Sequence, residues 1–293
     1  MERIAQNYHF NEDKRLLAKM KEEFFDCPAA VKYIRSLNIP DNVIEQEIVK
    51  IYDLVCDIKI CRNCPGVDNC SKDTPRLCTK IIYEDGVVSR VLVPCKEYLK
   101  LVKFKSQFVV RDFEEEWLFS TKKMDRTPKR EEVVKKYANY LDGNSKEWIY
   151  IIGESGTGRT YVAANIAIDL AKNEKGPIAF INAPIRFKEL RNTKDNEKFD
   201  EIIDKYSSIP VLIVDDFGNE YKNEFVRENI LFPIINNRAR KHLFTIFTSD
   251  FNINDITTMY VTNEASKPKV KQIKRILKNC CGKEINLGEM SIY

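Results

Sequence analysis

The stretch Gly153-Glu154-Ser155-Gly156-Thr157-Gly158-Arg159-Thr160 lies between the apolar run WIYII (148–152) and the alanine-rich run YVAANIAIDLAK (161–172). A glycine-rich loop between a strand and a helix turns its backbone N–H groups inward around phosphate oxygens. The N-terminus of the following helix adds the positive end of its dipole. The stretch therefore predicts a phosphate-binding loop for ATP, in which the Thr160 hydroxyl ligates Mg²⁺.

One residue of this loop departs from the usual motif, because Arg159 stands where lysine is common. A lysine side chain is a compact point charge, whereas arginine is a broad planar fork. Arg159 keeps the positive charge, so we expect nucleotide binding to persist. Phosphoryl transfer depends on positioning and charge stabilisation, and a broad fork fits less well between the β- and γ-phosphates. We therefore expect a weak ATPase that binds ATP well and turns it over slowly.

Two acidic residues follow a second apolar run, VLIVDDFG (211–218). In open α/β sheets, ligands bind outside the carboxyl ends of the strands, which is where Asp215 and Asp216 would lie. We predict that Asp215 holds Mg²⁺, directly or through water, and that Asp216 is the catalytic residue that orients or polarises the attacking water. A third apolar run, LFTIFTS (243–249), is followed by Asp250, which could contact phosphate through a bridging water or could cap the next helix.

Strand-like and helix-like runs alternate from Glu147 to the C-terminus. Such alternation predicts an α/β fold, a parallel sheet with helices on both faces. The predicted strands are WIYII (148–152), PIAFINA (177–183), IPVLIVDD (209–216) and LFTIFTS (243–249). The predicted helices are TYVAANIAIDLAKNEK (160–175), IRFKELRN (185–192) and EFVRENILFPIINNRARK (224–241).

The N-terminal half has a different pattern. Residues 12–58 are predicted to be helical, since KRLLAKMKEEFF (14–25) spaces its apolar residues by three and four. The segment KIIYEDGVVSRVLV (80–93) alternates around Asp85-Gly86, which predicts a β-hairpin. We divide the chain into a helical domain over residues 1–100, a linker over 101–125 and the nucleotide-binding domain over 126–293. Seven Lys or Arg residues lie between Lys122 and Lys136, and they form either a solvated linker or a DNA contact.

Cysteine usage indicates a metal site. Six of the nine cysteines fall between Cys56 and Cys95. The N-terminus lacks the apolar core of a secretory signal, and no run approaches the ~18 apolar residues of a membrane span. We therefore expect a cytoplasmic protein without a membrane partner, in which disulfides are rare. Tetrahedral Zn²⁺ takes four thiolates, and five cysteines compete for the four places: Cys61, Cys64, Cys70, Cys78 and Cys95.

The order of these features resembles the DnaI-type primosomal helicase loaders, which are related to DnaC and carry an AAA+ ATPase domain. The most specific segments are CRNCPGVDNC (61–70), VPCKEYLK (93–100), PVLIVDDFGNE (210–220) and VRENIL (226–231). The resemblance implies an ATP-dependent loader that acts in initiation or restart of DNA replication. Its N-terminal module would bind the replicative DnaB-type helicase hexamer, and its AAA+ domain would bind ATP and single-stranded DNA and self-associate.

The resemblance also implies roles for individual residues. Relatives often place histidine at the position of Cys78, which favours Cys61, Cys64, Cys78 and Cys95 as the zinc ligands and leaves Cys70 spare. Within KVKQIKRIL (269–277), Arg275 matches an arginine that reaches the nucleotide of a neighbouring subunit. Asp250 matches a position where a polar residue senses the γ-phosphate.

Two other functions fit parts of the pattern. A transposition-type AAA+ regulator has the same ATPase domain but generally lacks a zinc module, so the cysteine cluster argues against it. A nucleotide-binding adaptor that no longer hydrolyses ATP would explain the unusual Arg159 and Asp250. The net charge of +4 permits a nucleic-acid partner without requiring one.

Overall fold

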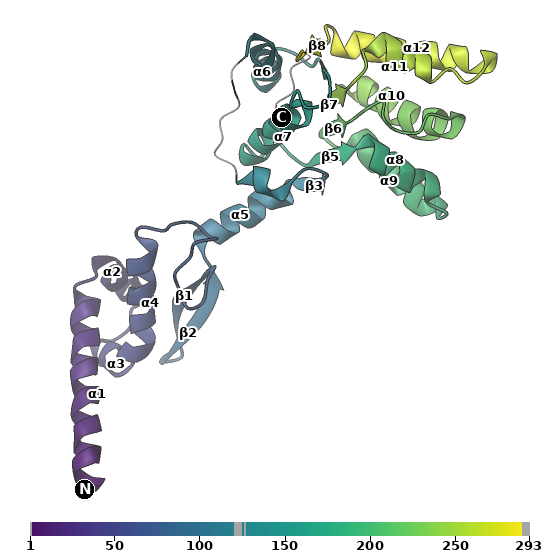
Figure 1. Ribbon diagram of the computed structural model, residues 1–293. Helices are drawn as coiled ribbons and strands as arrows, with labels where there is room; N and C mark the ends of the chain where they lie inside the picture. Colours follow the sequence, from purple (N-terminus) through teal and green to yellow (C-terminus); the bar gives the residue numbers. More distant parts are fainter. Residues whose placement is uncertain (1, 120–124, 126, 289–293) are drawn as a thin grey trace. The chain divides into compact units, whose positions relative to one another are not determined.

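The computed structural model describes residues 2–119, 125 and 127–288, and the side chains from Lys14 onward. The chain divides into two units, Met1–Lys103 and Phe104–Tyr293 (Figure 1). Within the described residues, no helix combines the length and the apolar character needed to cross a membrane.

The first unit packs helices against a β-hairpin. Its elements are α1 (Glu2–Phe25), α2 (Pro28–Ser36), α3 (Asp41–Gln46), α4 (Ile48–Cys61), β1 (Leu77–Glu84) and β2 (Val87–Pro94), followed by α5 (Lys96–Ser106). One apolar cluster joins them, in which Ile34 and Ile51 from the helices meet Ile81 from the hairpin. The turn residues Asp85 and Gly86 have φ values of 50° and 78°, as a tight hairpin turn requires. The predicted helical region and hairpin are both present.

The second unit is built on one sheet of parallel strands. The strands are β3 (Phe108–Arg111), β4 (Ile149–Ile152), β5 (Ile178–Asn182), β6 (Val211–Asp215), β7 (Phe244–Ser249) and β8 (Ile285–Asn286). Their order across the sheet is β3-β5-β6-β7-β4-β8, and every pairing is parallel. The chain therefore passes from β4 to β5 across two intervening strands, which requires helical crossovers on the faces of the sheet.

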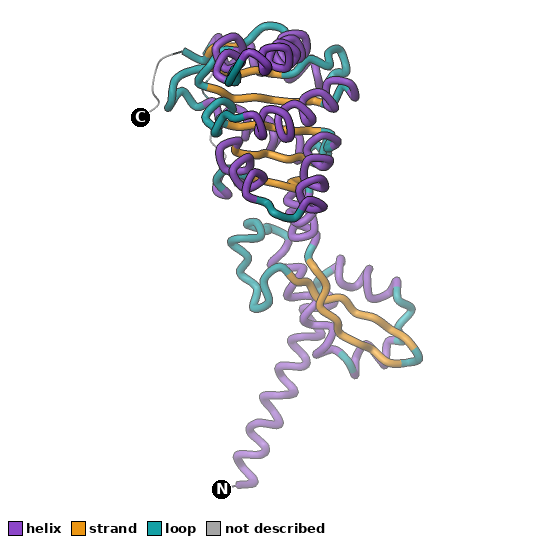
Figure 2. Tube along the Cα trace, turned by 90° about the vertical axis from the view of Figure 1, so that its right-hand side faces the viewer, coloured by secondary structure: helices purple, strands orange, loops and turns teal. Residues whose placement is uncertain are grey.

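Helices cover both faces of this sheet (Figures 1 and 2). One face carries α6 (Pro128–Leu141) and α7 (Arg159–Lys172); the other carries α8 (Ala183–Asn192), α9 (Asn196–Ser208), α10 (Phe232–Lys241), α11 (Ile253–Met259) and α12 (Lys267–Cys281). Strand residues alternate between the two cores: Ile149 and Ile151 face the first, and Trp148 and Tyr150 face the second. The predicted α/β layer architecture is confirmed.

Three elements were not expected from the sequence: β3, β8 and α9. Strand β3 lies inside the segment 101–125 that we interpreted as a linker, and it forms the edge of the sheet beside β5. It is only four residues long, too short to show a period of its own. In the basic stretch 122–136, residues 122–124 and 126 lie outside the described residues, and residues 128–136 form the first part of α6.

Candidate nucleotide-binding site

The predicted phosphate-binding loop connects β4 to α7, as expected from the sequence. Gly156 and Gly158 have φ values of 85° and 82°, a region that side chains other than glycine rarely enter. Gly153 is required by lack of space and not by its φ value, because a Cβ atom added to it would lie 2.8 Å from the hydroxyl of Thr157. The Thr157 hydroxyl in turn donates to the Glu154 carbonyl (2.8 Å) and holds the curve of the loop.

The register of the sheet brings the predicted site residues together. Strand β7 lies between β6 and β4, and Ile152 pairs with Ser249. The phosphate-binding loop after β4, Asp215 at the end of β6 and Asp250 after β7 therefore share the carboxyl edge of three adjacent strands. This is the edge at which open α/β sheets bind ligands.

Asp215 forms an oxygen cluster with two threonines. The Thr160 hydroxyl lies 3.0 and 3.2 Å from its two carboxylate oxygens, and the Thr248 hydroxyl donates to Oδ1 at 2.5 Å. Burial raises the pKa of Asp215 to about 6, although the hydrogen bond from Thr248 opposes that rise. Carboxylate and hydroxyl oxygens are ligands suited to Mg²⁺, so Thr160 and Asp215 could hold the ion as the sequence predicts.

Asp216 sits in an unusual backbone conformation, with a φ of 53°. Its N–H donates to the Thr248 hydroxyl (3.0 Å), and its Oδ2 accepts from the Asn182 side-chain amide (3.1 Å). Positive φ is uncommon outside glycine and is often retained at functional sites. Sequence reasoning missed Asn182 and Thr248; their position at the carboxyl ends of two predicted strands is the signal that could have found them.

Arg159 points toward the acidic residues of its own chain. Its side chain is only 7% exposed, and Nη1 donates to the Gly153 carbonyl and to Oδ1 of Asp250. Its Nη2 lies 3.9 Å from Oδ1 of Asp216. The sequence predicts a guanidinium directed at phosphate; the structure shows one already bound to carboxylate.

Asp250 does not cap the next helix, which was one of its two expected roles. The N-cap of α11 is Asn252, whose side chain accepts from the backbone N–H groups of Asn254 and Asp255. The second carboxylate oxygen of Asp250 instead accepts from the Asn219 side chain at 2.6 Å. Asp250 is thus a ligand of Arg159 and Asn219 at the edge of the site.

Arg275 lies on α12 and is exposed to solvent. The opposite face of that helix carries Ile273 and Leu277 into the core of the second unit. An outward-facing arginine is free to meet another molecule, so its predicted action on a neighbouring subunit stays a prediction.

The predicted zinc ligands are only partly gathered. Cys61, the last residue of α4, lies close to Cys78 on β1, and the ammonium of Lys72 lies 3.1 Å from the Cys78 sulfur. Burial raises the pKa of Cys61 to about 11. Cys64 is exposed, and the Cys95 sulfur accepts the N–H of Tyr98 (3.3 Å). Across the residues that the structure describes, no three His, Cys, Asp or Glu side chains form a metal-binding group.

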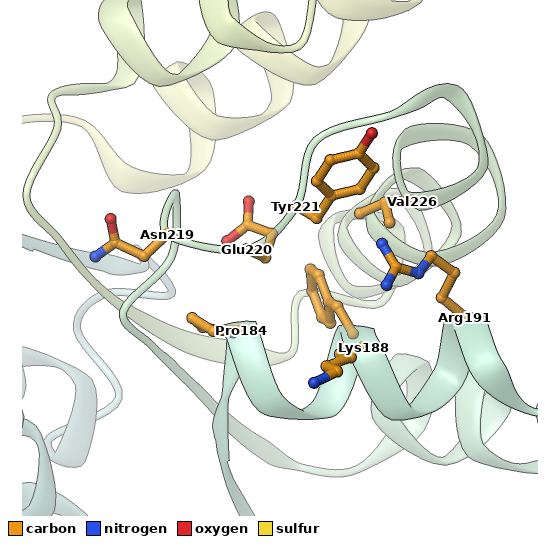
Figure 3. A pocket seen from close by; sticks show the side chains of 8 residues that line it. Pro184, Lys188, Arg191, Asn219, Glu220, Tyr221 and Val226 are labelled. Atoms are coloured by element: carbon orange, nitrogen blue, oxygen red, sulfur yellow. The ribbon is translucent and has the colours of Figure 1, made fainter.

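A hollow of about 150 Å³ lies beside the loop that follows Asp216 (Figure 3). It is lined by residues of α8 and of the segment after β6: Pro184, Phe187, Lys188, Arg191, Asn219, Glu220, Tyr221 and Val226. The guanidinium of Arg191 lies 5.0 Å from the centre of the Tyr221 ring, and Tyr221 is 68% exposed. An exposed aromatic ring and two cations therefore share this hollow.

Comparison with known proteins identifies the family. Residues 80–280 match the family model described as IstB-like ATP binding protein. The chain belongs to the IstB-like family. The matched region of this IstB-like protein includes the phosphate-binding loop, Asp215, Asp216 and Asp250, so the family supports nucleotide binding at the site described above.

Individual relatives confirm the predicted resemblance and the AAA+ type fold of this IstB-like protein. The replicative helicase loader DnaI of Bacillus subtilis (strain 168) is 23% identical over 278 residues, which cover 90% of this chain and 88% of the relative. A crystal structure of DnaI aligns with a TM-score of 0.55 and 26% identity over 62% of this chain and 97% of that one. A primosome component from Streptococcus pyogenes serotype M3 shares the fold, with a TM-score of 0.53 and 19% identity over 66% and 98% of the two chains.

Proposed function

We propose that this protein is an ATP-dependent loader of a replicative helicase, acting in initiation or restart of DNA replication. The N-terminal unit binds a DnaB-type hexamer, and the AAA+ domain binds ATP and single-stranded DNA. The observation that carries this proposal is the length of the match to the helicase loader DnaI. That match covers 90% of the chain, so it reaches well before residue 80, where the family match begins. The likeness therefore includes the N-terminal unit as well as the ATPase domain.

The geometry of the second unit supports the nucleotide-dependent part of this function. Thr160 and Asp215 present the oxygens for Mg²⁺, and Asp216 stands next to them for the attacking water. The exposed Arg275 supports self-association, in which α12 of one copy completes the site of another. A loader that switches between nucleotide states uses ATP binding to favour one conformation and hydrolysis to reset it.

The hollow beside α8 supports the single-stranded DNA part. Proteins that bind single strands without sequence preference combine cations for the backbone with aromatic rings for the bases. Lys188 and Arg191 provide the charge, and Tyr221 provides an exposed ring. We propose that a base stacks on Tyr221 while the adjacent phosphates contact the two cations.

A loading assay tests the function. The full chain, the cognate hexameric helicase and circular single-stranded DNA are mixed, and helicase retained on the DNA after gel filtration is measured. We expect retention to need both the chain and ATP. Failure of the chain to bind the helicase, with or without ATP, would overturn the loader function.

Variants of Tyr221 separate the DNA contact from helicase binding. We expect Tyr221→Ala to weaken single-stranded DNA binding by roughly 10-fold, because stacking contributes ~1–3 kcal/mol per base. Tyr221→Phe keeps the ring and serves as the matched control with near-normal affinity. Helicase binding should be unchanged in both. Equal DNA affinity of the alanine variant and the native chain would remove the hollow from the proposed function.

We also propose that the N-terminal unit holds one structural Zn²⁺ through Cys61, Cys64, Cys78 and Cys95. The support is the contact between Cys61 and Cys78, which joins the end of α4 to the hairpin. Cys64 follows α4 within one turn, and Cys95 directly follows β2. When bound, Zn²⁺ would tie these segments together in a unit whose apolar core is small.

Metal analysis and mutation test the zinc proposal. We expect one zinc per chain in protein purified without chelator, and loss of helical signal from the N-terminal unit on chelation, because metal binding and folding share one free energy. Cys61→Ser should lose the metal, and Cys70→Ser is the matched control that keeps it. A metal-free native protein contradicts the proposal, and loss of zinc from the Cys70 variant contradicts the choice of ligands.

A further inference from the structure

The two unusual residues of the nucleotide site are partners of each other. Arg159 replaces the common lysine of the phosphate-binding loop, and Asp250 places a carboxylate at the end of the neighbouring strand. The Arg159 guanidinium donates to that carboxylate, with side-chain exposures of 7% and 31%. A second donor, the Asn219 amide, holds the other carboxylate oxygen at 2.6 Å.

We propose that Asp250 is an internal counter-ion that occupies Arg159 in the nucleotide-free protein and competes with nucleotide phosphate for it. The proposal rests on the proposed nucleotide-binding function and adds how that site is regulated. A carboxylate and a phosphate offer a guanidinium the same planar pair of acceptor oxygens. Nη1 of Arg159, which reaches Asp250 and Gly153, carries N–H groups that a phosphate would use.

The carboxylate of Asp250 contacts the side chain of Arg159 and does not cap the backbone of the helix that follows it. Asn252 already caps α11, so Asp250 has no capping role. Its two oxygens are taken by Arg159 and Asn219, which come from the loops after β4 and β6. The carboxylate thus links the two loops that surround the phosphate site, and a ligand that removes Arg159 from it also loosens that link.

The consequence for binding follows from linkage. If an ion pair is present in the free protein and broken in the complex, breaking it costs free energy and weakens nucleotide binding. Removing the pair should therefore make the free protein less stable and the complex tighter. A pair with a purely structural role would persist in the complex, and its removal would lower stability equally with and without nucleotide.

Asp250→Asn tests the proposal, because asparagine keeps the size and one acceptor oxygen but lacks the charge. We expect calorimetry to show tighter binding of Mg²⁺–ATP, by on the order of 10-fold, as expected for a lost charge-assisted hydrogen bond. The melting temperature without nucleotide should fall by several degrees, and the difference from the native protein should disappear at saturating ATP. Asp204→Asn, exposed on α9, removes the same charge elsewhere on the second unit and should change neither quantity.

The outcomes are distinct. Unchanged or weaker ATP affinity of Asp250→Asn, with ATP binding by the native protein intact, overturns the counter-ion proposal alone. An equal loss of melting temperature with and without ATP overturns it as well. Absence of ATP binding in both proteins overturns the proposed nucleotide-binding function and this inference with it.

Discussion

Asp215→Ala should abolish the Mg²⁺-dependent part of ATP binding and lower the ATP hydrolysis rate by about 100-fold or more. Asp215 is 2% exposed at the end of β6, and its carboxylate contacts the hydroxyl of Thr160. Alanine removes both oxygens that we assign to the ion. Loss of the ion then weakens stabilisation of the transition state more than binding of the ground state. The hydrolysis rate therefore falls more than the affinity for ATP.

Calorimetry with ATP in the presence and absence of Mg²⁺, together with phosphate release, measures both effects. Asp204→Ala, exposed on α9, removes a carboxylate elsewhere on the second unit and should leave binding and hydrolysis unchanged. Because Asp215 is buried and also accepts from Thr248, circular dichroism must show that the alanine variant is folded. Equal ATP affinity of the native protein with and without Mg²⁺ would show that Asp215 is not the metal-side carboxylate.

The second large effect concerns stability. Arg238→Met should lower the free energy of unfolding of the second unit by about 3–5 kcal/mol. Arg238 is fully buried on α10, and its guanidinium donates to four neutral oxygens: Thr245 Oγ1 (2.9 Å) and the carbonyls of Tyr206 (2.9 Å), Ile209 (2.7 Å) and Phe244 (2.6 Å). Burial lowers the pKa of Arg238, because the charged guanidinium is less favourable away from water.

Methionine matches the aliphatic length of arginine but supplies no donor. The carbonyls of Tyr206 in the last turn of α9, of Ile209 just after that helix and of Phe244 at the start of β7 would lose these partners. An unsatisfied buried group costs ~1–3 kcal/mol. Urea unfolding followed by circular dichroism measures the loss. Arg240→Met, exposed two residues along the same helix, should stay within about 0.5 kcal/mol of the native protein. A similarly small change for Arg238→Met would show that its four hydrogen bonds do not stabilise the second unit.

The strands that were predicted correctly are those with long apolar runs. PIAFINA and LFTIFTS are buried on both faces, as parallel strands are, and they stand out from the polar segments around them. Strands β3 and β8 were not predicted, because edge strands of four and two residues are too short to show an apolar run or an alternation. Their pairing depends on neighbours supplied by distant parts of the chain, β5 and β4.

The amino-acid sequence by itself determined the phosphate-binding loop, the paired carboxylates and the four central strands of the sheet, because glycine spacing and apolar periodicity are local properties. Only the tertiary structure decided which polar groups meet. Asn182 reaches Asp216, Thr248 reaches Asp215, and Arg159 pairs with Asp250, which is 91 residues away. These contacts follow from the strand order of the sheet, and that order is set by how the helices pack on both faces of the sheet and not by any local pattern.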